Sequence, residues 1–319
     1  MPGRGGAARV PRASWSVRMT GVATFAVPPS FLGVARQGRD ASFVVAGIPL
    51  DVGTTNRAGA REGPAAIRRA SRMLVDGAHP RFGIEPAALE LADIGDFPLA
   101  LGDIPGSLAA IEEQAEGLRH LVALGGEHGI TLPLLRALAR RAGRRLALVQ
   151  FDAHVDTWPE NFGQRFAHGS VFYHAIEEGL VAPERMVQVG IRSPVQREVW
   201  DWTVGRGVTV LSAADVHEAG PESVAGRIRT VIGGAAAYLS FDIDALDPAF
   251  APGTGTPEIG GLASWQAQAI LRRLGGIAFV GADVVEVAPA YDTAEITALA
   301  AATIAWEYLA LVGAAGCSE

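Results

Sequence analysis

The sequence predicts an α/β fold in which a mostly parallel sheet is covered by helices on both faces. Three observations support this class: short apolar runs recur along the chain, amphipathic stretches alternate with them, and polar side chains follow directly after several runs. Alternating strands and helices are typical of parallel sheets, because a crossover between parallel strands needs a long connection. With 319 residues and 49% hydrophobic content, the chain can bury one large core.

The predicted strands are short runs rich in apolar and β-branched residues. They are SFVVAGI (42–48), LELADIG (89–95), LVAL (121–124), RLALVQF (145–151), MVQVGI (186–191), VTVL (208–211), AYLSFD (237–242) and IAFVGADVVEV (277–287). Apolar residues at three- and four-residue spacing predict helices at 107–121, 132–142 and 264–274. Gly63-Pro64 marks another helix start, since proline is favoured in the first turn.

One α/β domain is predicted for residues 41–319, because no linker, repeat or low-complexity segment interrupts the chain after residue 40. Residues 1–40 are predicted to form an N-terminal extension whose first part is disordered, and Met19 is an alternative start. The Ala-rich stretch from Thr297 to Gly316 approaches a membrane-spanning length. Since Glu307 interrupts it, we expect a buried terminal helix instead.

The composition excludes several classes of function. The net charge of −7 gives no reason to expect nucleic acid or an anionic membrane as a partner. All 27 basic residues are arginines, which excludes a pyridoxal Schiff base and a P-loop lysine. The single cysteine, Cys317, excludes a disulfide framework and a cysteine-based zinc site. We expect a reducing, cytoplasmic setting.

The stretch FDAHVDTW places three potential metal ligands, Asp152, His154 and Asp156, at alternate positions after an apolar run. In an extended chain they would share one face with about 6.5 to 7 Å between successive members, so the row suits a site for two ions better than one. Ligands of such sheets bind at the carboxyl ends of the strands. Four more polar groups stand at or just after the ends of other predicted strands, namely His128, Asp242, Asp244 and Glu286.

This donor set favours a hard or borderline divalent ion such as Mn²⁺ over structural zinc, because it combines carboxylates with imidazoles and has no thiolate. Two divalent ions would balance the four aspartates and can generate hydroxide near neutral pH. A cationic substrate suits such a centre, whereas phosphate esters would be repelled. A guanidinium group is planar, pairs well with a carboxylate such as Glu286, and offers a carbon for hydroxide to attack.

Five motifs resemble the signatures of the ureohydrolase family, which comprises arginases, agmatinases and related guanidino-acid amidinohydrolases. They are GGEHGIT (125–131), FDAHVDTW (151–158), HGSVF (168–172), SFDIDALDPAFAPGTGTPEIGG (240–261) and DVVEVAPAYD (283–292). The similarity runs from about residue 45 to the C-terminus. It implies an arginase-like three-layer sandwich around an eight-stranded parallel sheet, two Mn²⁺ per chain, and a trimeric or hexameric homo-oligomer.

The resemblance also implies roles for single residues. One ion would be held by His128, Asp152, Asp156 and Asp242, and the other by His154 and Asp244 together with the shared Asp152 and Asp242. His168 resembles the proton-shuttle histidine of the family, and Glu286 resembles the glutamate that receives the guanidinium. Hydroxide attack would give a tetrahedral intermediate that collapses to urea and a primary amine.

Two positions depart from the family pattern, since Glu127 and Gly129 stand where Asp and Ser are usual. Neither aligns with a metal ligand. We therefore expect metal binding to be kept, while outer-shell changes of this kind can lower metal affinity or activity by about 10- to 100-fold.

Agmatine is the expected substrate, giving putrescine and urea. Arginases recognise the amino-acid end of arginine with an SGNxHG-like loop, which NFGQRFAHG (161–169) lacks. The stretches GTTNRAGAREGP and VVEVAPAYDTAEITALAAA are more like bacterial agmatinases. Trp158, Asn161 and Phe162 are expected at the pocket mouth. Arg165 could meet a substrate carboxylate, which keeps guanidinobutyrate and proclavaminate-type substrates as alternatives.

Two further alternatives are a catalytically silent paralogue and a single-zinc, deacetylase-like amide hydrolase. Neither alternative is favoured, because all six ligand residues are present. Counting the metal ions per chain would distinguish these alternatives from the two-manganese enzyme. The remaining histidines are expected at the surface or on helices, at His79, His120, His174 and His217.

Overall fold

The computed structural model describes residues 29–35, 38–100 and 102–316. Eight strands form one sheet, and every pairing between them is parallel, which confirms the predicted fold class. The strands are β1 (Phe43–Ile48), β2 (Leu91–Asp96), β3 (Leu121–Gly125), β4 (Leu146–Phe151), β5 (Val181–Ile191), β6 (Thr209–Ser212), β7 (Ala236–Asp242) and β8 (Ala278–Val285). Only β5 differs much from its predicted range, because its first residues pair with the start of β4.

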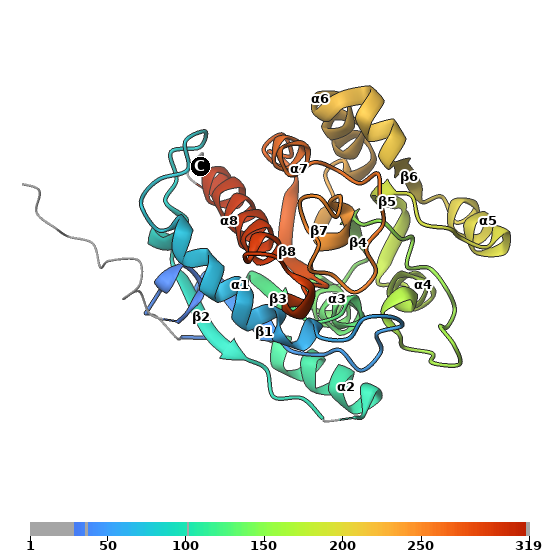
Figure 1. The fold of residues 1–319 in the computed structure, drawn as a ribbon, viewed down its shortest axis with the longest axis horizontal. Helices are drawn as coiled ribbons and strands as arrows, with labels where there is room; N and C mark the ends of the chain where they lie inside the picture. Colours follow the sequence, from blue (N-terminus) through green and yellow to red (C-terminus); the bar gives the residue numbers. More distant parts are fainter. Residues whose placement is uncertain (1–28, 36–37, 101, 317–319) are drawn as a thin grey trace, which may run out of the picture.

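The strand order is β2-β1-β3-β8-β7-β4-β5-β6, so β3, β8, β7 and β4 are consecutive neighbours at the centre of the sheet (Figure 1). In the register of these strands, Ala282 of β8 pairs with Val122 of β3 and with Leu239 of β7, which in turn pairs with Val149 of β4. Because all strands run in the same direction, their carboxyl ends lie along one edge. The four central strands are the ones that carry the predicted polar residues.

Helices cover both faces of the sheet and make it the middle of three layers (Figure 1). One core packs β-sheet side chains such as Val149 against α1 (Gly63–Ser71), α6 (Ala213–Ile232), α7 (Ser264–Leu271) and α8 (Ile296–Gly316). The other packs side chains such as Leu148 against α2 (Ile104–Ala115), α3 (Thr131–Ala142) and α4 (Val171–Glu177). Trp202 of α5 (Arg197–Gly205) borders this second core. Val149 and Leu148 face opposite layers because side chains alternate along a strand.

Helix α2 is shorter than predicted. It begins at a cap in which Gly106 N donates to the Asp103 carboxylate, and it ends at Ala115 instead of extending to 121. Gly117 has a φ of 78°, a left-handed conformation that stops the helix and turns the chain into β3. The apolar spacing that predicted the longer helix continues through this turn because Leu118 is also buried.

Helix α8 is the one helix of the described residues long and apolar enough to cross a membrane, and 67% of its apolar window is buried in the protein. It packs against α1, α7 and β8, as predicted for a buried terminal helix. Glu307 inside it is buried and is held by Arg272 and by His79 Nε2 at 2.8 Å. The prediction of a surface or helical position for His79 was wrong, since His79 is fully buried in a loop. A carboxylate in an apolar helix needs such partners.

The predicted disorder concerns residues that lie outside the described part of the chain, and the boundary at residue 41 stays a prediction.

Candidate metal centre

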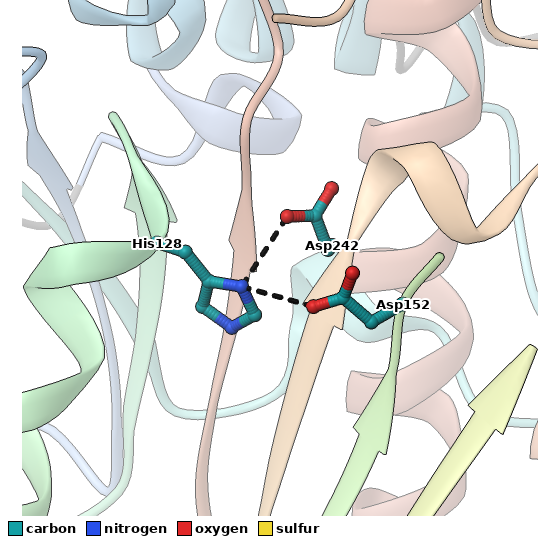
Figure 2. Close-up of side chains that lie close together, drawn as sticks. All are labelled: His128, Asp152 and Asp242. Carbon is teal, nitrogen blue, oxygen red and sulfur yellow. Dashed lines mark ion pairs between the residues drawn. The ribbon is translucent and has the colours of Figure 1, made fainter. Parts of the chain in front are cut away.

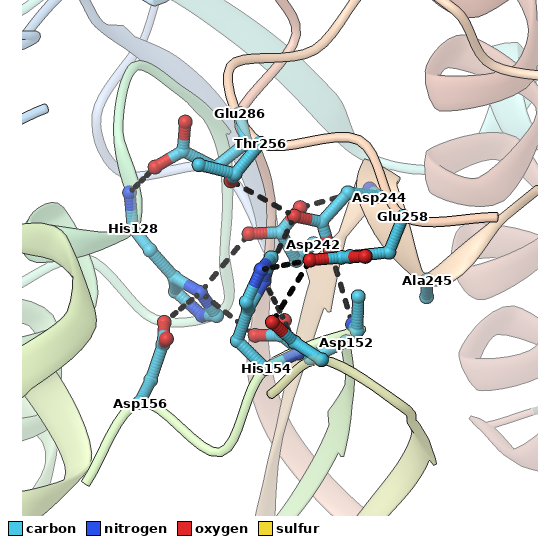
Figure 3. A network of polar contacts seen from close by, with 12 residues as sticks. His128, Asp152, His154, Asp156, Asp242, Asp244, Ala245, Thr256, Glu258 and Glu286 are labelled. Carbon is cyan, nitrogen blue, oxygen red and sulfur yellow. Dashed lines mark hydrogen bonds and ion pairs between the residues drawn. The ribbon is translucent and has the colours of Figure 1, made fainter. Parts of the chain in front are cut away.

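Seven polar side chains meet where the four central strands end (Figure 3). His128 follows β3, and Glu286 follows β8. Asp242 ends β7, and Asp244 lies in the next turn. The row Asp152, His154 and Asp156 follows β4, and all seven side chains except that of His154 are buried. The structure therefore brings together every residue that the sequence predicted as a metal ligand.

The first group surrounds His128. Its Nδ1 lies 3.0 Å from Asp156 Oδ2, 3.2 Å from Asp152 Oδ2 and 3.3 Å from Asp242 Oδ2. Figure 2 shows the ring of His128 directed at Asp152 and Asp242 from the opposite side of the site. One nitrogen and three carboxylate oxygens thus converge on one small volume.

The second group surrounds His154. Its Nδ1 lies 3.1 Å from Asp244 Oδ2 and 3.4 Å from Asp152 Oδ1. Asp152 therefore faces both histidines, with Oδ2 directed to His128 and Oδ1 to His154. The two groups that could each hold an ion share this carboxylate. An aspartate placed in this way suits a bridge between two cations.

The backbone fixes these side chains locally. Asp242 Oδ1 accepts a hydrogen bond from Asp244 N at 2.9 Å, and Asp244 Oδ1 accepts one from Ala153 N at 3.0 Å. The chain bends after β4, and Asp156 has a φ of 50°, which a residue with a side chain adopts only under constraint. This bend folds the alternating row, which would be too long in extended form, around the centre.

A cation fits between these groups, as the tautomer of His128 indicates. Its Nε2 lies 2.8 Å from Ser240 Oγ, and that hydroxyl donates its only hydrogen to Asp283 at 2.6 Å. Ser240 can therefore only accept from His128, so Nε2 carries a hydrogen, and in the neutral ring Nδ1 is a lone pair. This lone pair has no hydrogen-bond partner among the described residues and faces three carboxylate oxygens. Such an arrangement needs a positive charge between its members. Burial disfavours a charged ring, but the carboxylates outweigh it and raise the pKa of His128 well above its usual value. A metal ion at Nδ1 would take the place of the added proton.

The pKa values of the carboxylates also indicate that the site needs a cation. Burial, together with the negative charges of Asp244 and Asp152, raises the pKa of Asp242 well above its usual value. Burial and the charge of Asp152 raise the pKa of Asp156 to about 6. Burial also opposes ionisation of Asp152, but hydrogen bonds with His128 and His154 outweigh it and lower its pKa. Packed acids of this kind are stable in their charged form only with a compensating cation.

Glu286 and His168 form the adjacent part of the site. Glu286 has a φ of 65°, a left-handed conformation that turns its side chain back toward β3. Its Oε1 accepts from His128 N at 2.8 Å and lies 2.9 Å from His168 Nδ1. Burial lowers the pKa of His168, but the charges of Glu286, Asp156 and Glu127 outweigh it and raise the value to about 9.

Several supporting residues were not predicted. Asp283 of β8 is fully buried and accepts from Ser240, from Thr131 Oγ1 at 2.7 Å and from Tyr238 OH at 2.9 Å. Gln150 of β4 donates to Asp152 Oδ2 at 2.8 Å. A glutamine within the apolar run LALVQF was a signal that could have been used, since buried amides need partners.

A cavity of about 310 Å³ opens beside the two groups. Its lining residues include His154, Asp156, His168 and Asp242 on the inner side, and Trp158, Asn161, Phe162, Ser193, Pro194 and Gln196 further out. Trp158, Asn161 and Phe162 are thus among the lining residues, and their place at the pocket mouth stays a prediction. Arg165 is not among the lining residues, and its guanidinium lies 5.1 Å from the Phe166 ring centroid.

Comparison with known proteins covers most of the chain. Residues 41–310 match the model of the arginase family. An agmatinase of Escherichia coli O7:K1 is 46% identical over 277 residues, which are 85% of this chain and 87% of the relative. A hypothetical agmatinase of Burkholderia thailandensis has a crystal structure with a TM-score of 0.85 at 45% identity, covering 91% of this chain and 92% of that one. Proclavaminate amidino hydrolase from Streptomyces clavuligerus has a TM-score of 0.87 at 39% identity, covering 92% and 100%.

Proposed function

The chain belongs to the arginase family, whose members hydrolyse guanidino C–N bonds, and from that premise we propose that its substrate is agmatine, which it cleaves to putrescine and urea. Family membership also implies a binuclear metal centre.

One oxygen of Glu286 carries this proposal. Glu286 is buried, and while its Oε1 contacts His128 and His168, its Oε2 has no hydrogen-bond partner among the described residues. A buried, charged oxygen without a donor is costly. The planar N–H groups of a guanidinium would satisfy it, since a carboxylate pairs well with such a fork. Glu286 would hold the substrate with its guanidinium carbon beside the two histidine-aspartate groups.

The residues that would hold the metals are the two groups joined by Asp152. His128, Asp156 and Asp242 would complete one site, and His154 and Asp244 the other, with Asp242 shared. We propose Mn²⁺ as the ion, since carboxylates dominate and thiolates are absent from this set. When bound, two such ions supply Lewis acidity that lowers the pKa of water and polarises the guanidinium carbon.

His168 would move the proton that the departing amine needs. Its ring lies between Glu286 and the cavity, and the carboxylates around it favour the protonated imidazole near neutral pH. Protonation of the amine nitrogen prevents it from leaving as a strongly basic anion. Glu286 both orients the ring through Nδ1 and stabilises its positive charge.

The outer cavity favours agmatine over guanidino acids. No arginine lines it within the described part of the chain, so a carboxylate tail would find no guanidinium partner. Asp156 and Asp242 on the inner side add negative potential. A contact between Arg165 and a substrate carboxylate, which was one reason for the guanidino-acid alternative, has no support in this lining.

A urea assay tests the proposal. Protein loaded with Mn²⁺ is incubated separately with agmatine, arginine and guanidinobutyrate, and urea and putrescine are measured. Release from agmatine with little or none from the other two is expected. Release from guanidinobutyrate but not from agmatine would contradict the substrate assignment, and elemental analysis should find two Mn per chain.

A cytoplasmic location and a trimeric or hexameric assembly are also part of the proposal. Light scattering coupled to gel filtration measures the assembly.

A further inference from the structure

Glu127 is a fully buried carboxylate that ties the end of β3 to the loop after β1. Its Oε2 accepts a hydrogen bond from Gly53 N at 2.7 Å and another from Thr54 Oγ1 at 3.2 Å. The backbones of the two segments are also joined, because Glu127 N donates to Leu50 O at 2.7 Å. Buried carboxylates need donors of this kind, and here the donors lie 73 or 74 residues away in the chain.

The anchored loop continues directly to His168. Thr55 N donates to His168 Nε2 at 3.2 Å, and Thr55 Oγ1 lies 2.7 Å from the same nitrogen. This is the geometry of the neutral ring, before it takes up a proton. On the other side of the ring, Nδ1 contacts Glu286, which accepts from His128 N. These contacts form a closed ring that starts at Glu127 and returns to its neighbour His128. Both nitrogens of the imidazole are therefore held.

The space around Glu127 is matched to a glutamate. A Cβ on Gly53 would lie 2.6 Å from Glu127 Oε1, and a Cβ on Gly129 would lie 3.1 Å from it. The long side chain thus occupies volume that larger residues at these two positions would fill. An aspartate would draw the carboxylate back by about one C–C bond, or ~1.5 Å, and would lose the contact with Gly53 N.

Building on the proposed function, in which His168 delivers the proton, we infer that Glu127 is a positioning residue for His168. It holds Gly53 and Thr54, and the adjoining Thr55 holds His168 Nε2 at the cavity. Glu127 does not line the cavity and is not a member of either histidine-aspartate group. Apart from its negative charge, which also acts on His168, its link to the reaction is therefore the loop. A catalytic group displaced by about 1 Å can lose about 10²-fold in rate.

Two substitutions of Glu127 distinguish the effect of its side-chain length from the effect of its charge. Both are measured in steady-state assays of the Mn²⁺-loaded enzyme with agmatine. E127D keeps the charge and shortens the side chain, whereas E127Q keeps the length and removes the charge. E127D is expected to lower kcat by about 10- to 100-fold with KM changed by less than about twofold, and E127Q to retain a larger share of kcat. The matched control is E116D, at an exposed glutamate beyond the end of α2. An unchanged kcat in E127D, or a larger loss in E127Q, would overturn the inference.

A double-mutant cycle with Thr55 tests the route. Thr55 is exposed, so T55V removes the hydroxyl with little risk to folding, and T55S restores it. T55V should lower kcat by about tenfold or more, T55S should recover most of it, and E127D should add little in the T55V background. Fully additive losses would show that Glu127 does not act through Thr55. If E127D does not fold, the comparison of T55V with T55S tests the inference by itself. An unchanged kcat in T55V then overturns it.

Wild-type activity separates this inference from the proposed function. If the wild type releases no urea from agmatine, both fail. If it is active while E127D and T55V match it, only the positioning role fails.

Discussion

Asp152 presents its two carboxylate oxygens to two different histidines, Oδ2 at 3.2 Å from His128 Nδ1 and Oδ1 at 3.4 Å from His154 Nδ1. This one side chain, directly after β4, thereby joins the group around His128 to the group around His154.

D152N should remove more metal than H154N. The loss of Asp152 weakens both candidate sites, whereas the loss of His154 weakens one. Elemental analysis after gel filtration should find close to two Mn per chain in the wild type, about one in H154N, and fewer in D152N. Equal metal contents in the two variants would contradict a shared Asp152.

S240A should lower metal affinity without direct contact to an ion. The Ser240 hydroxyl fixes the hydrogen on His128 Nε2, and without it the ring can present either tautomer to the carboxylates. Affinity for Mn²⁺, measured by competition with a fluorescent chelator, should fall by about 10- to 100-fold. T230A, at an exposed helical threonine, is the matched control and should bind as the wild type does.

E286Q should lose catalysis while keeping its metals. Glutamine has the same shape but removes the charge that would pair with a guanidinium through Oε2. Truncating one partner of a buried charge pair costs about 2 to 5 kcal/mol, so kcat/KM for agmatine should fall by roughly 30-fold or more. E198Q, on the exposed start of α5, controls for the loss of one surface charge. A fall in Mn content comparable to that in activity would point to a different role.

Stabilisation by Mn²⁺ should be larger at pH 8 than at pH 5. Burial and Asp152 raise the pKa of Asp156 to about 6, and burial with Asp244 and Asp152 raises that of Asp242. Raised carboxyl pKa values mean that the metal-free fold binds more protons than the unfolded chain, so its stability falls as pH rises through the folded values. Adding Mn²⁺ to chelator-treated protein should therefore raise its melting temperature more at pH 8 than at pH 5. An equal gain at both pH values would argue against this origin.

Global stability should also fall on the acid side because of His120, which lies far from the metal centre. Burial, with a smaller contribution from Arg141, lowers its pKa to about 4, and its Nε2 lies 2.7 Å from Tyr308 OH. The stability that neutral His120 contributes is complete above about pH 6.5, the pKa of histidine in the unfolded chain. It is lost as pH falls toward 4, because the unfolded chain takes up the proton first. The free energy of unfolding in urea should be lower by about 1 to 2 kcal/mol at pH 5 than at pH 7.5 from this residue.

The variant H120Q tests this assignment. It should flatten the pH dependence between pH 7.5 and 5, whereas H217Q, at an exposed histidine, should leave it unchanged. The same slope in H120Q and the wild type would exclude His120 as its source.

Features encoded by neighbouring residues were predictable. The eight strands were found because a buried parallel strand is a short apolar run bounded by turns, and β1, β3 and β4 end within one residue of the predicted positions. The metal-ligand candidates were found because acids and histidines seldom follow such runs by chance. The end of α2 was misplaced, since Leu118 keeps the apolar spacing although the helix has already stopped.

Contacts between distant segments were not predictable in the same way. Asp283 resembles any other residue of a strand until β8 is placed between β3 and β7, where it meets Thr131 and Ser240. His79 meets Glu307 across 228 residues of chain, and nothing in its neighbourhood signals a buried partner.

By itself, the sequence determined the kinds of side chains and the strand ends that carry them, because strand formation and hydrophobic alternation depend on residues close together in the chain. The tertiary structure decided which of these ends are neighbours: the order β3-β8-β7-β4 unites donors that lie as far apart as His128 and Glu286. It also decided the bend that brings Asp156 toward His128 and the reach of Glu127 to the loop after β1. Strand order follows from how the helices pack on the two faces, and that packing is a property of the whole chain.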